Sequence, residues 1–500
     1  MSSHSNNSIS KSAKGTVLIA GGSGFIGNEV GAHLVRQGWL VRVLMRRPSP
    51  MAFPAEIHYW NGDGTVPDAA MTGVDAVVNL SGESIATGRW TSERKAAILN
   101  SRLQTTRAIV ASIQRHRTPA FVQTSAVGIY GDTGDRTTTE ETPTDQLIPA
   151  ETSAGGKFLV EVCRQWEAAA SQIDPSVTRL VILRTGVVLG STGGALPEML
   201  LPYEMGVGAV VGGGDQYISW IHISDYCQLI STALQSPRSA TDSALAGTYN
   251  AVTPGAVSIK TLHLVLNKYF PGLPWGFSNV AVPGWILRVG LGEKSTIVLD
   301  GQRVMPRRLM QFGFTFKFPA IEEALEDLLP APNGPFAGCA VLVRRQWVPA
   351  DIGRVWNFFS RAENLERMTP SFLAFRIVAK TTPAIEAGTE ISYRLRLHGV
   401  PIGWTSRITT FDPQQRFVDT QVRGPYAIWH HEHSFEALGS GQKRDGTLIS
   451  DVVHFKLPIG RPGRLVGQWF ARRDIGAIFD FRAKTVAGMI ESESISLQVR

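Results

Sequence analysis

The residues whose spacing most clearly indicates a ligand site are the glycines of AGGSGFIG, residues 20–27. They lie between an apolar, β-branched run at 16–20 and a helical pattern at 25–37. In such a turn the first glycine permits a tight bend, the second lets the backbone approach a pyrophosphate, and the third lets helix and strand pack closely. The free N–H groups at the start of the helix then bind phosphate. The segment predicts a dinucleotide site built from Gly21, Gly22, Ser23, Gly24, Phe25, Ile26 and Gly27; a structural turn without a ligand is the alternative.

Two arginines follow the second predicted strand, VRVLM at 41–45. Sites that prefer NAD usually place an acidic residue at this point for the ribose hydroxyls, whereas arginine can hold a 2′-phosphate. Arg46 and Arg47 therefore predict NADP(H) as the cofactor in preference to NAD(H). The alternative is that both are solvated surface charges.

The elements that must position this site alternate along the chain. Apolar runs at 75–80, 120–124 and 179–183 continue the pattern of the first two strands, and helix-length segments separate them. This alternation predicts an α/β fold of the Rossmann type, a doubly wound parallel sheet with helices on both faces, over residues 16–329. The polar residues 1–15 predict a disordered tail.

A Pro- and Gly-rich stretch at 330–339 ends this pattern and predicts a linker. The remaining residues, 340–500, predict an α+β domain. It begins with a strand at 340–347 and a helix at 351–360, continues with six strand-like runs between 372 and 456, and ends in a long helix at about 464–491.

Composition excludes several classes of protein. Hydrophobic residues make up 43% of the 500, so dominant disorder is excluded, and three distant cysteines favour neither disulfides nor a cysteine zinc site. Cysteine usage and the polar N-terminus predict a reducing, cytoplasmic location, and no apolar run is long enough for a membrane span.

The formal charge of +7 arises within residues 340–500, which carry 22 Lys and Arg against 15 Asp and Glu. Because these charges are spread out, we expect no nucleic-acid partner.

Residues 16–329 resemble the extended short-chain dehydrogenase/reductase superfamily of the NAD-dependent epimerase/dehydratase type, in an atypical branch. The residues that carry the resemblance are AGGSGFIG (20–27), VVNLSGESI (77–85), RWTSERK (89–95), NSRLQTTR (100–107), TSAVGIYGDTGDR (124–136), WEAAA (166–170), LRTGVVLG (183–190), QYISWIHISD (216–225) and LDGQRVMPRRL (299–309). The last block resembles the C-terminal extension of this branch, at about 280–329. The resemblance implies further cofactor contacts at Leu80, Ser81, Gly82, Arg102, Thr124 and Val187.

The resemblance also implies a serine that holds a reacting carbonyl, at Ser125, with a Tyr-x-x-x-Lys pair on the next helix. None of the nine tyrosines here has a lysine four residues later, and Phe158 occupies the tyrosine position. Tyr130 and His222 are the candidate substitutes for the proton donor, with packing and bracing roles as the alternatives. Blocks peculiar to this branch suggest substrate contacts, or loop bracing, by Glu83, Arg89 and Trp90.

Residues 340–493 resemble the helix-grip superfamily that includes START-like (SRPBCC) and polyketide-cyclase-like proteins. The residues that carry it are PADIGRVWNFFSRAENLERMTP (349–370), GTEISYRLRL (388–397), RFVDTQVRGPYAIWHHEHSFE (416–436) and RRDIGAIFDFR (472–482). The resemblance implies an apolar cavity for a hydrophobic small molecule. On the strand at 428–437, alternation places His431 and His433 on one face and His430 on the other. No carboxylate motif completes a ligand set in the sequence, so no metal is predicted.

Three functions remain open on this basis. The first is an NADP(H)-dependent oxidoreductase or isomerase with an unusual proton donor and a small-molecule substrate. The second is a regulatory protein that senses NADP(H), which is consistent with the cell-division annotation of some plastid and cyanobacterial relatives. The third is a carrier of a hydrophobic metabolite. Neither the substrate nor the oligomeric state follows from the residues.

Overall fold

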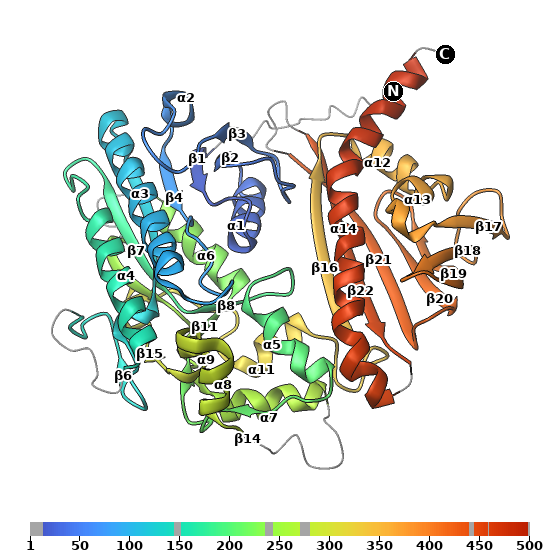
Figure 1. The fold of residues 1–500 in the computed structure, drawn as a ribbon. Helices are drawn as coiled ribbons and strands as arrows, with labels where there is room; N and C mark the ends of the chain where they lie inside the picture. The colour runs from blue at the N-terminus through green and yellow to red at the C-terminus, as the bar shows by residue number, and fades with distance from the viewer. Residues whose placement is uncertain are drawn as a thin grey trace, which may run out of the picture.

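The computed structural model describes residues 14–144, 152–235, 244–270, 281–439, 445–458 and 460–498. It contains two seven-stranded sheets, one in each half of the chain (Figure 1). The tail predicted at 1–15 lies outside the described residues except for Lys14 and Gly15, and Gly15 already belongs to the first strand.

The first sheet is parallel throughout and confirms the predicted Rossmann-type fold. Its strands lie in the order β12-β7-β5-β4-β1-β2-β3. Because the order reverses between β1 and β4, a crevice opens there at the carboxyl ends of the strands. The strands are β1 (Gly15–Ala20), β2 (Trp39–Met45), β3 (Glu56–Tyr59), β4 (Ala76–Asn79), β5 (Ala120–Ala126), β7 (Arg179–Thr185) and β12 (Gly247–Ala251).

Helices cover both faces of this sheet (Figure 1). Alternate residues of β1 take part in two different cores: Val17 and Ile19 pack with α1 (Phe25–Arg36) and α6 (Ile223–Leu234), and Leu18 packs with α3. The second core is closed by α2 (Asp68–Met71), α3 (Ser92–His116) and α4 (Ala154–Ala170). The near-continuous apolar runs of the strands follow from this burial on both sides.

A smaller lobe of short elements extends the first sheet at its carboxyl edge. Its strands are β6 (Thr137–Thr138), β8 (Val187–Leu189), β9 (Val210–Val211), β10 (Tyr217–Ile218), β11 (Trp220–His222), β13 (Val257–Ser258), β14 (Ala281–Val282) and β15 (Arg303–Val304). Its helices are η1 (Val127–Tyr130), α5 (Ala195–Glu204), α7 (Ile259–Tyr269), α8 (Gly284–Leu291), η3 (Gly292–Ser295), α9 (Thr296–Leu299), α10 (Arg307–Phe312) and α11 (Ile321–Leu328).

The second sheet is antiparallel and has the order β16-β22-β21-β20-β19-β18-β17. Its strands are β16 (Ala340–Val348), β17 (Arg376–Lys380), β18 (Glu390–Leu397), β19 (Val400–Asp412), β20 (Arg416–Arg423), β21 (Ile428–Leu438) and β22 (Gly446–Lys456). The long helix α14 (Gly460–Gln498) runs along the sheet (Figure 1) and packs Ile475 and Phe479 against it. This arrangement confirms the predicted helix-grip fold.

The connection between β16 and β17 differs from the expected single helix. Three short elements occupy it: α12 (Ile352–Phe359), α13 (Glu363–Arg367) and the 3-10 turn η4 (Ser371–Leu373). The strand expected from residue 372 therefore begins only at Arg376. Pro370, directly before η4, cannot donate a hydrogen bond to a sheet.

The two sheets are joined by an interface that the sequence analysis did not predict. Leu438 and Leu448 of the second sheet belong to the same buried cluster as Leu34 of α1. The Trp347 amide also donates to the Met51 carbonyl at 2.7 Å. Side chains add the ion pairs Arg36–Glu436 and Arg345–Glu29.

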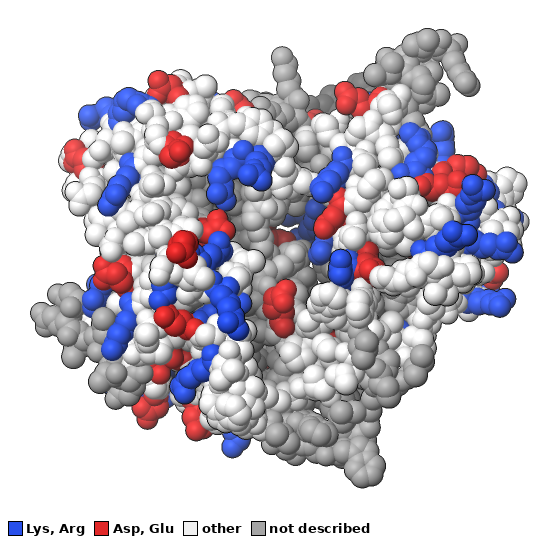
Figure 2. Space-filling model, viewed as in Figure 1, with Lys and Arg blue, Asp and Glu red and all other residues white. Residues whose placement is uncertain are grey.

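Two further observations concern the surface and the helices. On the face shown in Figure 2, Lys and Arg lie among Asp and Glu over both halves of the chain. Among the described residues, no helix is both long enough and apolar enough to cross a membrane.

The most buried ion pair of the interface joins Glu204 of α5 to Arg472 of α14. The Glu204 side chain is only 2% exposed, and it also accepts a hydrogen bond from Gln468. Removing one partner of such a pair leaves a buried charge without compensation. We therefore expect Glu204→Gln to lower the free energy of unfolding by about 3–5 kcal/mol, measured by calorimetry.

The matched control is Glu198→Gln, an exposed position in the first turn of the same helix. It removes the same charge, and we expect it to cost less than about 1 kcal/mol. Equal effects of the two substitutions would show that the Glu204–Arg472 pair adds no stability to the interface.

Candidate functional site

The turn between β1 and α1 has the geometry of a phosphate-binding loop. Gly21 has φ of +84°, and a Cβ atom there would lie 2.8 Å from the backbone carbon of Leu80. A Cβ on Gly27 would lie 2.6 Å from the Cα of Gly22, so the helix can approach only without one. No side chain caps α1 at Gly24. The start of the helix is therefore available to an anion.

A cavity lies beside this loop. The ends of β1 and β2, the residues that follow β3 and β4, and one face of α3 line it. This is the crevice expected where strand order reverses. Its lining includes the predicted residues Gly21, Ser23, Gly24, Arg46, Ser81 and Gly82, together with Glu83. Leu80 instead packs against the core of the sheet.

A second hollow continues from the first at the end of β2. Ser23 and Arg46 line both hollows, and Arg47 and Ser49 line only this one. Two guanidinium groups and two hydroxyls in one hollow make a site suited to a phosphate monoester.

Glu83, predicted to contact substrate, lies at the wall of the nucleotide cavity. Its carboxylate pairs with Arg94 at 3.0 Å and with Arg46 at 3.8 Å. Arg102 donates to the Glu83 carbonyl at 3.0 Å and stacks over Trp166. In this conformation, Arg102 holds the loop after β4.

Ser125 and Tyr130 take part in one buried polar network. The Ser125 hydroxyl donates to Glu167 at 2.7 Å, and Arg184 donates to both oxygens of the Glu167 carboxylate at 3.0 and 2.9 Å. Arg184 also donates to the Tyr130 hydroxyl, which donates to Asn250 at 2.8 Å. Ser125 and Tyr130 are both at least 96% buried.

The network explains why Tyr130 is a poor acid in this conformation. Burial raises the pKa of the Tyr130 hydroxyl, and the nearby Arg184 only partly offsets this effect. Thr124, the residue before Ser125, turns its hydroxyl to the Asn79 carbonyl at 2.8 Å. Val187 is half-buried in β8, where its amide donates to Ser219.

His222 is separate from that network. It is the N-cap of α6: its Nδ1 accepts a hydrogen bond from the Ser224 amide at 3.1 Å. Its ring packs against Phe318 at a tilt of 40°, and its Nε2 lies 3.4 Å from Asp327. Burial lowers the pKa of His222 to about 4, so the ring is neutral at pH 7.

The remaining predicted substrate residues brace a loop. Arg89 donates to the Gly290 carbonyl at 3.3 Å, and the Trp90 indole donates to the Ile85 carbonyl at 2.9 Å. Trp90 also packs edge-on against Phe158, the residue at the expected tyrosine position. The Lys95 ammonium lies over the Phe158 ring, 5.4 Å from its centre.

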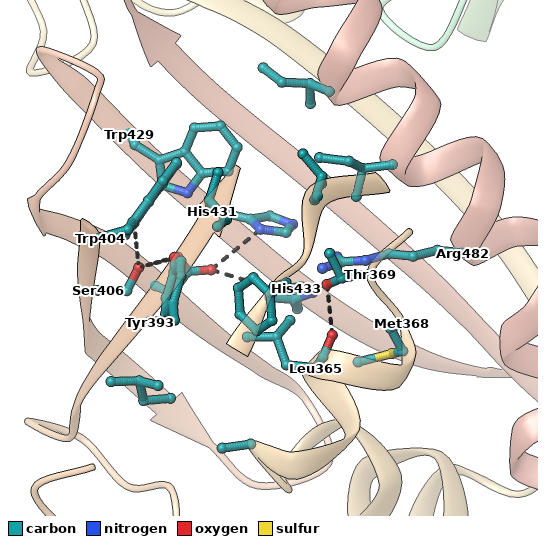
Figure 3. A pocket seen from close by; sticks show the side chains of 18 of the residues that line it. Leu365, Met368, Thr369, Tyr393, Trp404, Ser406, Trp429, His431, His433 and Arg482 are labelled. Carbon is teal, nitrogen blue, oxygen red and sulfur yellow. Dashed lines mark hydrogen bonds and ion pairs between the residues drawn. The ribbon is translucent and has the colours of Figure 1, made fainter. Parts of the chain in front are cut away.

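The helix-grip half contains a cavity between the sheet, α14 and the short helices (Figure 3). Most of its wall is apolar or aromatic, as predicted for a hydrophobic ligand. The wall includes Phe359, Leu365, Met368, Ile391, Leu395, Trp404, Phe417, Trp429, Ile475 and Phe479. One patch of it is polar, and His431 and His433 belong to that patch.

The structure adds a residue that the sequence argument about these histidines did not include. Their expected faces are correct, because His431 and His433 are buried while His430 is only partly so. A carboxylate does complete a possible ligand set, however, because Asp419 of the neighbouring strand lies beside both. A search for motifs along the chain misses this residue because it comes from β20.

The chain matches three family models in succession. Residues 17–251 match the NAD dependent epimerase/dehydratase family, and residues 282–328 match a domain of unknown function (DUF1731). Residues 348–479 match the family described as polyketide cyclase / dehydrase and lipid transport.

Individual relatives agree with the first two matches. Epimerase family protein YfhF of Bacillus subtilis is 32% identical over 316 residues, which are 63% of this chain and 97% of that protein. Epimerase family protein SDR39U1 of Mus musculus is 31% identical over 319 residues, 63% of this chain and 99% of that protein. The crystal structure of human SDR39U1 with NADPH is 29% identical and has a TM-score of 0.54, covering 64% of this chain and 100% of that one.

The fold and the glycine-rich loop together define a dinucleotide-binding protein of the Rossmann type. The chain belongs to the NAD dependent epimerase/dehydratase family, in the group of epimerase family proteins that includes SDR39U1, and carries a polyketide-cyclase-like domain after it.

The buried His222 predicts a dependence of stability on pH. In the unfolded chain a histidine takes up its proton near pH 6.5, whereas His222 in the folded protein does so near 4. Below pH 6.5 the unfolded state therefore binds more protons, and stability falls until about pH 4. We expect His222→Asn, which keeps a capping side chain, to remove about 2 kcal/mol of this fall between pH 7 and pH 4.5.

Denaturant titrations of the wild type and the variant at pH 7 and pH 4.5 measure this difference. His116→Asn is the control, because that ring lies at the surface beside the exposed Asp68. A wild type and His222→Asn variant with parallel pH profiles would contradict the assignment.

Proposed function

We propose that the first half of the chain binds NADP(H) in the cavity beside the glycine loop. The observation that carries this proposal is the hollow lined by Ser23, Arg46, Arg47 and Ser49, which continues from the pyrophosphate loop at the end of β2. Among the residues that the structure describes, no acidic side chain lines that hollow. The NADPH in human SDR39U1, 29% identical over 64% of this chain, supports the same cofactor.

The residues present fit such a dinucleotide. The turn at Gly21 and the start of α1 would hold the pyrophosphate, and Ser81 and Gly82 would lie along the adenosine. Arg46 would exchange its 3.8 Å pairing with Glu83 for the 2′-phosphate. When bound, the nicotinamide supplies or accepts hydride; the chain's own residues bind and orient it.

Arg46→Ala should weaken NADPH binding by roughly 5- to 150-fold, as for a charge-assisted hydrogen bond worth about 1–3 kcal/mol. NADH affinity should change little, because NADH lacks the 2′-phosphate. Calorimetric titration of the full chain with both nucleotides measures this.

The matched control for Arg46→Ala is Arg94→Ala. Arg94→Ala removes a guanidinium that pairs with Glu83 but does not line either hollow; we expect it to leave the preference for NADPH over NADH in place. Equal affinity of the wild type for NADPH and NADH would contradict the proposal.

We also propose that the chain divides into an NADP(H)-binding domain at 16–329, a linker at 330–339 and a helix-grip domain at 340–500 that binds a hydrophobic small molecule. The apolar wall of the cavity supports the ligand class. The interface between the sheets implies that a cut within the linker leaves the two domains associated.

Hydride transfer to a carbonyl substrate is the second candidate function, and one observation favours it. Ser125 is the penultimate residue of β5 and donates to Glu167. Arg184 donates both to Glu167 and to Tyr130, so hydrogen bonds connect this strand end to the Tyr130 hydroxyl. A carbonyl that replaced Glu167 as the partner of Ser125 would be polarised by the hydroxyl. The competing view is that the network only braces the strands and that the protein senses NADP(H).

Ser125→Ala distinguishes these views. If Ser125 holds the carbonyl, hydride transfer from bound NADPH should slow by about 10²-fold while NADPH affinity stays the same. Stopped-flow oxidation of bound NADPH with a panel of carbonyl compounds measures the rate. Tyr130→Phe is the matched comparison, because it removes a hydroxyl from the other end of the same network. A wild type that oxidises NADPH no faster than Ser125→Ala would favour the sensor.

A further inference from the structure

The polar patch in the helix-grip cavity is built from three adjacent strands. His431 and His433 alternate along β21 and turn to the same face (Figure 3). In the sheet register, Asp419 of β20 lies opposite His431, and Asp451 of β22 lies opposite His433. Opposed residues of antiparallel strands share a face and lie about 5 Å apart. The register therefore brings two imidazoles and two carboxylates together at one place.

Three of these side chains have the separations of metal ligands. The Asp419 Oδ2 lies 3.3 Å from His431 Nδ1 and 3.7 Å from His433 Nε2. All three ligand atoms lie within 4.8 Å of one another. Ligands at about 2.0–2.1 Å from a tetrahedral zinc are roughly 3.3 Å apart. We propose that Asp419, His431 and His433 bind a divalent first-row transition metal ion.

The fourth member of the patch orients the two histidines. The Asp451 Oδ1 accepts a hydrogen bond from His431 Nε2 at 2.9 Å. It also lies 2.7 Å from His433 Nδ1, although that nitrogen is off the hydrogen-bonding angle. In each ring the nitrogen that faces Asp451 is the one that Asp419 does not approach. A carboxylate behind each ligating imidazole is the usual outer partner of a metal-bound histidine.

Asp419 is oriented in the same way. The Ser406 hydroxyl donates to its other oxygen, Oδ1, at 3.2 Å, and the Trp404 indole donates to Ser406 at 3.1 Å (Figure 3). Oδ2 therefore remains directed at the two histidines. A ligand set with both histidines and the carboxylate held by further contacts is preorganised for an ion.

The chemistry of the set selects the kind of ion. Two imidazoles and one carboxylate suit Zn²⁺ or Fe²⁺, whereas Mg²⁺ and Ca²⁺ prefer an all-oxygen set. Three protein ligands leave at least one coordination position open. Because all three residues line the cavity, a bound molecule with an oxygen donor can reach that position.

An alternative without a metal is well defined. A protonated histidine between the two carboxylates, with the cation Arg482 on the cavity wall, would also balance the buried charge. The two alternatives differ in whether a divalent ion binds at this place, which a direct titration decides.

The test uses untagged full-length protein, freed of metal with a chelator and titrated with Zn²⁺ by calorimetry. We expect one equivalent to bind to the wild type, and at least 10-fold weaker binding to His433→Gln. His430→Gln is the matched control: it lies on the same strand but pairs with Thr420 instead of the patch, and it should bind as the wild type does. Asp451→Asn should weaken binding by about 10- to 100-fold, as for an outer partner.

A second measurement does not depend on the folding of any variant. Co²⁺ bound to the wild-type patch should give the visible absorption of a four- or five-coordinate site, and Zn²⁺ should abolish it. Failure of the wild type to bind either ion would overturn the proposal and leave the protonated histidine as the explanation. The proposal would also be overturned if His430→Gln weakened Zn²⁺ binding as much as His433→Gln.

Discussion

The close approach of two backbones at the carboxyl edge of the first sheet is the constraint on which the nucleotide site depends. At Gly21 the chain leaves β1 in a left-handed conformation and passes so close to Leu80 that no side chain fits. Gly27 lets α1 start directly above this turn. Because of this close approach, one cavity is lined by three parts of the chain. They are the start of α1, the end of β2 with Arg46, and the loop after β4. Any larger residue at Gly21 or Gly27 would separate the helix from the strand ends that share its ligand.

Much of this part of the molecule could be predicted because its signals are local. The apolar runs and the glycine spacing of residues 20–27 lie within single elements, so the strand ends and the position of Arg46 follow from them. The same holds for the alternation that places His431 and His433 on one face of β21.

What could not be predicted depends on register and packing between distant elements. The partners of Ser125 and Tyr130 are Glu167 and Arg184, which come from α4 and β7 and show no motif with them. Asp419 reaches His431 only through the pairing of β20 with β21. The Glu204–Arg472 pair joins residues 268 positions apart. In each case the residue types are visible in the chain, but the contact exists only once the sheets and helices are assembled.

The two cavities differ in how their polar side chains are engaged in hydrogen bonds. In the Rossmann half, the candidate proton donors have partners already: Ser125 is bound to Glu167, Tyr130 to Asn250, and His222 caps a helix. Trp90 covers Phe158 where the family pattern implies a tyrosine. In the helix-grip half, two imidazoles and a carboxylate line a mostly apolar cavity and converge within 4.8 Å. A buried polar cluster is costly unless its groups are paired, and here Asp451 and Ser406 pair with the outer atoms of the cluster. Among the described residues, the inner atoms that Asp419 and the two histidines turn toward one another are therefore where the proposed ion would bind.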